Sequence, residues 1–130
     1  VLDIDKFCSF DGKTGPYLLY SLVRINSILS KAQDFEPNFE LNSDISKEIL
    51  LNVVKLSSDI ALSYKEKSPN IMCQSAYVLA SSFSTLYANE NILQEKNEQK
   101  RNALLTLLKL VSKSLNIVCN LLAIDVPNKM

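Results

Sequence analysis

The sequence contains no histidine, and only two glycines and four prolines among its 130 residues. The lack of histidine excludes Ser-His and Cys-His catalytic pairs and every metal site built on imidazole. So few turn-forming residues argue against an all-β fold, which needs a turn about every 8–12 residues. Glycine-rich phosphate loops of the GxxxxGK[ST] and GxGxxG types are also missing. We therefore expect no catalytic residue, metal site or cofactor site in this chain.

Charge of one sign is not in excess, because 14 Lys and Arg residues balance 14 Asp and Glu residues. A nonspecific nucleic-acid binder carries a clear positive charge, so this class is not favoured. The charge is nevertheless uneven along the chain. Residues 96–130 hold six basic and two acidic side chains, whereas residues 1–95 hold eight and twelve. The last quarter of the sequence is therefore locally basic.

Long apolar runs and paired cysteines are likewise missing. No run approaches the roughly 18–20 residues of a membrane helix, so we expect no membrane association. Cys8, Cys73 and Cys119 lie far apart, and we expect three free, buried thiols in a reducing cytoplasm. The chain starts with Val1 and no signal-peptide pattern follows, which is typical of a piece of a larger protein.

Hydrophobic residues make up 47% of the chain, and their spacing predicts helices. The four expected helices span about 16–32, 46–65, 71–88 and 99–122. We expect N-caps at Thr14 or Gly15 for the first helix and at Asn70 for the third. The apolar stripes of the last three helices consist of Ile49, Val53, Leu56 and Ile60; Met72, Ala76, Leu79, Phe83 and Leu86; and Leu104, Leu108, Val111, Leu115, Val118 and Leu122.

These stripes predict an all-α fold, an antiparallel helical bundle of about four main helices. The bundle occupies residues 14–130, and residues 1–13 form a lead-in from a preceding domain. We expect a monomer, because four amphipathic helices bury one another's apolar faces.

The first helix carries a second cluster of side chains away from its leucines. At about 100° per residue, Leu18, Leu22, Ile25 and Leu29 fall within a sector about 60° wide. Tyr17, Tyr20 and Arg24 gather about 140° around the helix from that sector. Two rings and a guanidinium can stack on unpaired bases and meet phosphate. Alternatively, both rings flank a neighbouring helix and Arg24 pairs with a carboxylate.

The same stretch resembles a known family. Gly12 to Tyr20 reads GKTGPYLLY and continues to Arg24 and Ser27-Ile28. It is similar to G-x-TGPYLQYAHAR-x-x-SI, the opening of the C-terminal anticodon-binding domain of arginyl-tRNA synthetases. Leu19, Leu22 and Ala123 depart from the family pattern, where glutamine, histidine and glycine are common. Further matching positions are Tyr77, Leu79, Ala80, Phe83, Tyr87, Arg101, Leu121, Leu122, Ile124, Pro127 and Met130.

The resemblance implies an all-helical domain that binds the tRNA anticodon loop. A catalytic domain of the same chain would activate arginine with ATP in the cytoplasm. Carried over position by position, the residues near the anticodon are Tyr17, Tyr20, Arg24, Tyr87 and Met130.

Two alternatives remain open at this point. The leucine seam of the last helix is also typical of a helical protein-interaction or dimerisation module. Related helical domains occur in other class I synthetases and in a glycyl-tRNA synthetase subunit, although the TGPY-x-x-Y stretch favours arginine.

Overall fold

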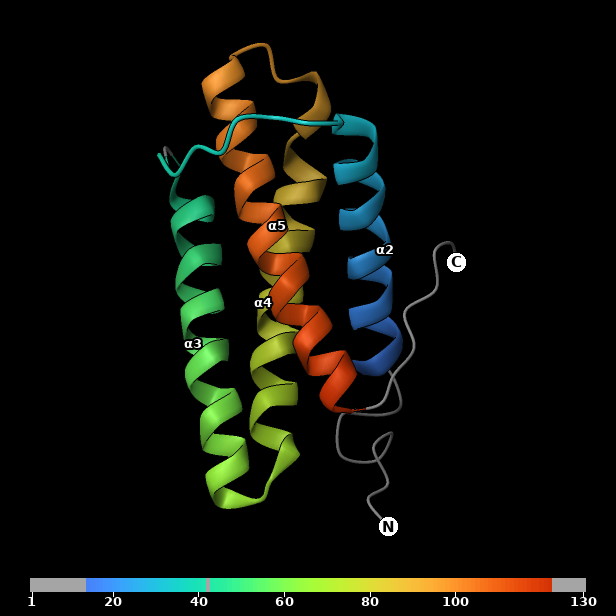
Figure 1. Ribbon diagram of the computed structural model, residues 1–130, viewed down its shortest axis with the longest axis vertical. Coiled ribbons are helices and arrows are strands. Elements are labelled where there is room, and N and C mark those ends of the chain that lie inside the picture. The colour runs from blue at the N-terminus through green and yellow to red at the C-terminus, as the bar shows by residue number, and fades with distance from the viewer. Residues whose placement is uncertain (1–13, 42, 123–130) are drawn as a thin grey trace.

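The computed structural model describes residues 14–41 and 43–122, which form four long helices and one short 3-10 helix but no strand. The elements are α2 (Thr14–Ala32), α3 (Asp44–Glu66), α4 (Pro69–Asn89), η2 (Ile92–Gln94) and α5 (Glu98–Leu121). Successive long helices run in opposite directions, so α2 and α4 are parallel to each other (Figure 1). Helices α4 and α5 lie between α2 and α3 (Figure 1). The predicted antiparallel bundle is confirmed.

The helix ends follow local capping chemistry, with two corrections to the predicted caps. The Ser43 side chain accepts a hydrogen bond from the Ser46 amide at the start of α3, and Asn97 does the same for Lys100 at the start of α5. Helix α4 begins at Pro69, so the expected cap at Asn70 is wrong. Proline suits this first position because its missing N–H would have no helical partner there. The expected cap of α2 is also wrong, because α2 already includes Thr14 and Gly15.

The apolar stripes meet in one core. Leu18, Leu22 and Ile25 of α2 are fully buried. The predicted stripes of α4 and α5 are buried throughout, whereas Val53 and Ile60 of α3 are only half-buried. Helix α3 packs most extensively against α4. These stripes explain why the chain forms a bundle, since each helix buries one face against the others.

The connection between α2 and α3 crosses the end of the bundle where α5 begins (Figure 1). Two hydrogen bonds hold it to α5. The Asn38 amide donates to Thr106 Oγ1 at 3.0 Å, and Asn38 Nδ2 donates to the Gln99 carbonyl at 2.9 Å. This attachment joins the end of α2 to α5 before the chain turns into α3.

The leucine seam of α5 faces the interior, with Leu108, Val111 and Leu115 fully buried. It is therefore not an exposed dimerisation surface. By length and composition alone, α5 is the one helix among residues 14–41 and 43–122 that could cross a membrane. Half of its apolar window is buried inside the bundle. The absence of membrane association remains a prediction.

The cysteines depart from the expectation of three free thiols. Cys119 is free and buried, and its burial raises the pKa of the thiol to about 11. Cys73 is also buried but is disulfide-bonded, so the prediction is wrong at that residue. Cys8 lies outside the described residues.

Candidate nucleic-acid interface

The side of α2 opposite its leucines is exposed along most of its length. Tyr20 exposes 53% of its surface, and Arg24 is exposed one turn further on. Neither side chain belongs to the buried core, whereas Leu22 between them is fully buried. The predicted separation of the two helix faces is therefore confirmed for Tyr20 and Arg24.

Tyr17 is placed differently, because it packs against α4. Its ring centroid lies 5.1 Å from that of Tyr77, with the ring planes tilted by 40°. Its hydroxyl shares a 2.8 Å hydrogen bond with Ser84 Oγ. The ring is half-buried against the core, so Tyr17 flanks a second helix as one alternative expected. This contact fixes Tyr17 and adds the 40%-exposed ring of Tyr77 beside it.

Arg24 contacts an aromatic ring. Its guanidinium carbon lies 4.9 Å from the ring centroid of Tyr87, at the end of α4. A cation over an aromatic face is attracted by the negative electrostatic potential of the ring. Tyr87 also packs against Phe83, with centroids 5.8 Å apart, and keeps 44% of its surface exposed. The fold thus brings together two of the residues proposed for RNA binding, one from each helix.

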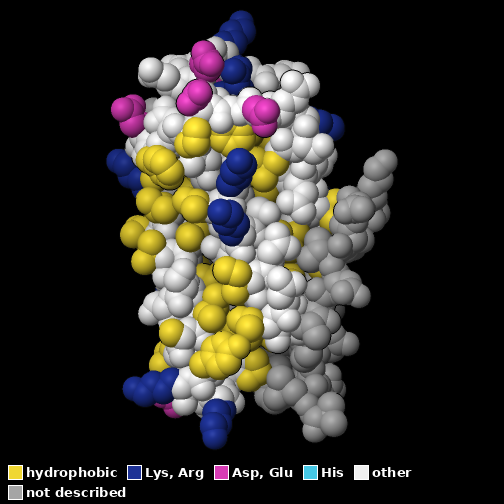
Figure 2. Space-filling model, in the orientation of Figure 1, with side chains coloured by type: hydrophobic (Ala, Val, Ile, Leu, Met, Phe, Trp, Pro, Cys, Tyr) yellow, Lys and Arg dark blue, Asp and Glu magenta, His cyan; other side chains and the backbone are white. Residues whose placement is uncertain are grey.

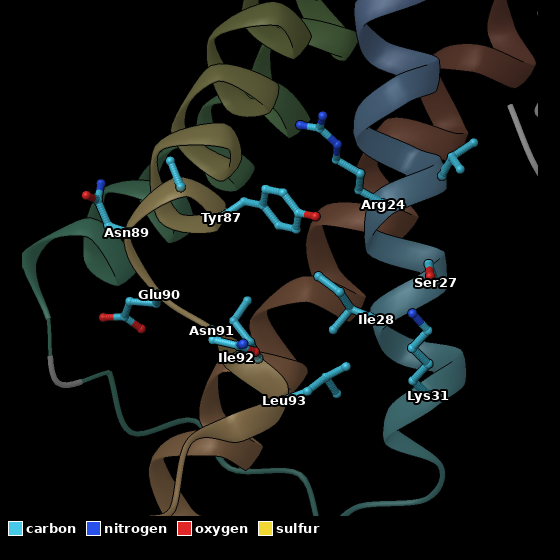
Figure 3. A pocket seen from close by; sticks show the side chains of 12 residues that line it. Arg24, Ser27, Ile28, Lys31, Tyr87, Asn89, Glu90, Asn91, Ile92 and Leu93 are labelled. Atoms are coloured by element: carbon cyan, nitrogen blue, oxygen red, sulfur yellow. The ribbon is translucent and has the colours of Figure 1, made fainter.

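A groove of about 620 Å³ opens beside this pair, between the second half of α2 and the α4–η2 junction. Figure 3 shows Tyr87 reaching from the end of α4 toward α2, with Ile28 and Leu93 across the groove from it. Asn89 and Glu90 line the same region but extend away from α2 (Figure 3). The groove therefore combines an aromatic ring, an aliphatic floor and polar side chains.

The groove also holds two cations, Arg24 and Lys31. Among residues 14–41 and 43–122, the only ion pairs are Lys55 with Asp59 and Lys100 with Glu95. Arg24 and Lys31 therefore have no carboxylate partner in this part of the chain. Such unneutralised cations are available to a phosphate group.

The basic last quarter of the sequence does not supply these charges. None of its described basic residues lines the groove, and Lys109 instead lies over the ring of Phe35 at 4.9 Å. On the face seen in Figure 2, Lys and Arg are scattered, and Asp and Glu gather mainly at the end where α5 begins. The electropositive part of the groove is therefore local to α2.

The predicted site residues are only partly brought together. Tyr17, Tyr20 and Arg24 share one side of α2, and Tyr87 joins them from α4. Met130 lies outside the described residues. Sequence reasoning missed Lys31, although it follows Arg24 by seven residues and so projects from the same helix face. Within the described residues, no cluster of three potential metal ligands occurs.

Comparison with solved structures defines the class of domain. Over 94% of its length the chain matches Thermus thermophilus arginyl-tRNA synthetase, with a TM-score of 0.83 and 25% identity, and it covers 22% of that chain. A putative arginyl-tRNA synthetase from Campylobacter jejuni gives a TM-score of 0.80 at 21% identity, with 92% of this chain and 27% of that chain covered. The fold is thus that of an all-helical domain found in arginyl-tRNA synthetases.

The sequence assigns the family. The family described as DALR anticodon binding domain matches residues 18–130, and the chain belongs to this family. Arginine–tRNA ligase of Alkaliphilus oremlandii is 36% identical over 135 residues, and that of Agathobacter rectalis is 34% identical over 138 residues. Both alignments cover 100% of this chain but only 23% of the relative. The chain therefore spans less than a quarter of the length of these curated relatives.

Proposed function

We propose that this chain binds the anticodon loop of an arginine-accepting tRNA, as the anticodon-binding domain of an arginine–tRNA ligase. The chain performs no chemistry in this role. A catalytic domain elsewhere in the same polypeptide uses ATP to join arginine to the tRNA. We place the parent enzyme in the cytoplasm and propose that this domain acts as a monomer without membrane contact.

The observation that carries the proposal is the contact of Arg24 on α2 with the exposed ring of Tyr87 on α4, together with the exposed ring of Tyr20 on α2. Tyr20 and Tyr87 are each about half exposed, and Arg24 lies over Tyr87. Bases in a single-stranded loop present free faces that stack on such rings, and an arginine beside them binds phosphate. A double helix offers no free base faces, so this arrangement favours a loop over duplex RNA.

The charge distribution supports a local contact with RNA. The chain has no net charge, so long-range attraction between the whole domain and RNA is weak. Affinity must then come from the few unpaired cations of α2 and from stacking. We expect modest salt dependence, in contrast to the steep dependence of proteins that neutralise many phosphates.

The test measures the affinity of the chain for an anticodon stem–loop RNA of an arginine tRNA, by fluorescence anisotropy at two salt concentrations. We expect Tyr20→Ala to weaken binding by about 1–3 kcal/mol, the usual contribution of one stacking aromatic. Arg24→Ala should weaken binding and reduce its salt dependence. The matched control is Tyr64→Ala, because Tyr64 is 66% exposed on α3, away from this face.

The proposal is contradicted by two outcomes. One is equal loss of affinity in Tyr20→Ala and Tyr64→Ala. The other is equal affinity for the stem–loop and for a fully paired RNA duplex of the same number of nucleotides.

A further inference from the structure

We infer that the groove beside Tyr87 holds one unstacked nucleotide of the bound RNA, with Lys31 at its phosphate and Asn91 at the edge of its base. This inference rests on the proposed function. It adds Lys31 of α2 and Asn91, the residue before η2, to the residues already proposed to bind RNA. Within the described residues those are Tyr17, Tyr20, Arg24 and Tyr87.

The size of the groove fits a single nucleotide. Its volume of about 620 Å³ lies within the range of about 300–1,000 Å³ of small-molecule pockets. The groove is only partly enclosed and is lined by Arg24, so a nucleotide within a continuous RNA strand can enter it. A stacked duplex is too wide for such a space, whereas a base turned out of a loop fits it.

The walls suit the flat face of a base. In the view of Figure 3, Arg24 lies on one side of the Tyr87 ring, and Ile28 lies on the other side, with Leu93 beyond it. Arg24 therefore covers part of the ring, and the side toward Ile28 is the one proposed for the base. A base that enters there stacks against Tyr87 and is supported by the half-buried aliphatic side chains of Ile28 and Leu93.

The polar groups are placed for the remaining parts of a nucleotide. Lys31 is exposed, has no ion-pair partner in the described part of the chain and lines the groove, with its side chain lying along α2 toward Ser27 (Figure 3). An ammonium group of this kind attracts phosphate as a point charge. Asn91 is exposed at the opposite wall, and its amide both donates and accepts hydrogen bonds. That combination matches the mixed donor and acceptor edge of a base.

Glu90 does not cancel the positive charge at this position. Its carboxylate extends away from α2, whereas the Lys31 side chain lies along α2 (Figure 3). A phosphate beside Lys31 is therefore not forced against a carboxylate.

The first experiment tests the cation. The salt dependence of anticodon stem–loop binding is measured for the wild-type chain, for Lys31→Ala and for Lys113→Ala. Lys113 is the matched control, because it is an exposed lysine of α5 that does not line the groove. We expect Lys31→Ala to reduce the slope of log K against log salt by about 0.7, the value for one phosphate contact on a single strand. An unchanged slope, or the same change in both variants, overturns the inference.

The second experiment locates the base. Each loop nucleotide of the RNA is replaced in turn by an abasic residue, and binding is measured with wild type and with Tyr87→Ala. At one loop position, we expect the abasic residue to weaken wild-type binding by about 5- to 150-fold and to have little further effect in Tyr87→Ala. Asn91→Ala should reduce discrimination among the four bases at that same position, whereas Asn120→Ala, at an exposed residue of α5, should not. If no loop position couples to Tyr87, the groove holds no base.

The two proposals fail in different ways. Loss of stem–loop preference, or no effect of Tyr20→Ala, defeats the proposed function and the groove inference together. Normal stem–loop binding that depends on Tyr20 but not on Lys31 or Asn91 defeats only the groove inference. Circular dichroism and a urea midpoint for each variant verify folding.

Discussion

The phenolic oxygen of Tyr17 lies 2.8 Å from the hydroxyl oxygen of Ser84, so one hydrogen bond joins the first turn of α2 to the fifth turn of α4. The same tyrosine also packs its ring against Tyr77. Tyr17 therefore has two partners on α4, one for its ring and one for its hydroxyl. Its orientation is set by the packing of the two helices, in contrast to the exposed ring of Tyr20.

Removing only the hydroxyl separates these two contacts. Tyr17→Phe should lower the free energy of unfolding by about 0.5–1.5 kcal/mol, the net value of one hydrogen bond in a half-buried position. Ser84→Ala should have a similar effect, and the double variant should lose less than the sum. The measurement is urea unfolding of the four proteins. Full additivity would show that the two hydroxyls do not stabilise each other.

Two neighbouring positions on α2 should respond in opposite ways. Leu22 is fully buried, so Leu22→Ala should cost about 2–5 kcal/mol of folding stability and leave the RNA affinity of the folded protein unchanged. Tyr20→Ala should change stability by less than about 0.5 kcal/mol, because the ring is exposed. Urea midpoints read alongside RNA affinities distinguish the two effects. Equal destabilisation by both variants would place Tyr20 in the core.

The helices and the buried stripes could be predicted from sequence because they depend on local periodicity. A residue at i, i+3, i+4 or i+7 shares a helix face whatever the rest of the chain does. This rule placed Leu22 in the core and Tyr20 outside it. The same rule, extended by seven residues from Arg24, would also have placed Lys31 on the side of α2 proposed to bind RNA.

The contact of Arg24 with Tyr87 could not be predicted in this way. It depends on the rotation of α4 relative to α2, which follows from the packing of whole helices. The sequence allowed a carboxylate partner for Arg24, and the fold supplied an aromatic ring instead. The position of Asn91 could not be predicted for a related reason, since it lies in the connection after α4, where no helical period applies.

The buried thiol of Cys119 should be unreactive in the folded chain. At pH 8, iodoacetamide should modify it slowly, because the thiolate is the nucleophile and burial raises the pKa of this thiol from 9.0 to about 11. Denaturation in urea should make it react rapidly. Mass spectrometry of the peptide that contains Cys119 measures both rates. Fast modification under native conditions would mean that the end of α5 opens readily.

The raised pKa of the Cys119 thiol also predicts that the free energy of unfolding depends on pH. Between pH 9 and 11 the thiol of Cys119 keeps its proton in the folded chain and loses it in the unfolded chain. The unfolded state therefore binds fewer protons, and the free energy of unfolding falls as the pH rises through this window. The Cys119→Ala variant should lack this part of the fall in the free energy of unfolding. The comparison of the two proteins removes the contribution of all other groups.

A substitution at the end of α3 should stabilise the chain. Lys67 is the C-cap of α3 and has a φ of 53°, in the left-handed region. A residue with a side chain is destabilised by about 1–2 kcal/mol in this region, and substitution by glycine removes that cost. The greater conformational freedom of glycine in the unfolded chain offsets about 0.5–1 kcal/mol of the stabilisation. Lys67→Gly should therefore raise the free energy of unfolding by about 0.5–1 kcal/mol. The control Lys65→Gly, inside the helix, should lower it by about 1 kcal/mol.

Helices α2 and α4 carry the proposed interface together, although the whole of α3 separates them in sequence. An RNA loop that contacts both would act as a reversible cross-link between distant parts of the chain. At a free RNA concentration of one hundred times Kd, this linkage would add about 2.7 kcal/mol to the free energy of unfolding. Some amide hydrogens of α2 exchange only when α2 separates from the bundle, and these would then exchange about a hundredfold more slowly. Hydrogen exchange therefore measures directly whether the two helices hold the RNA as one unit.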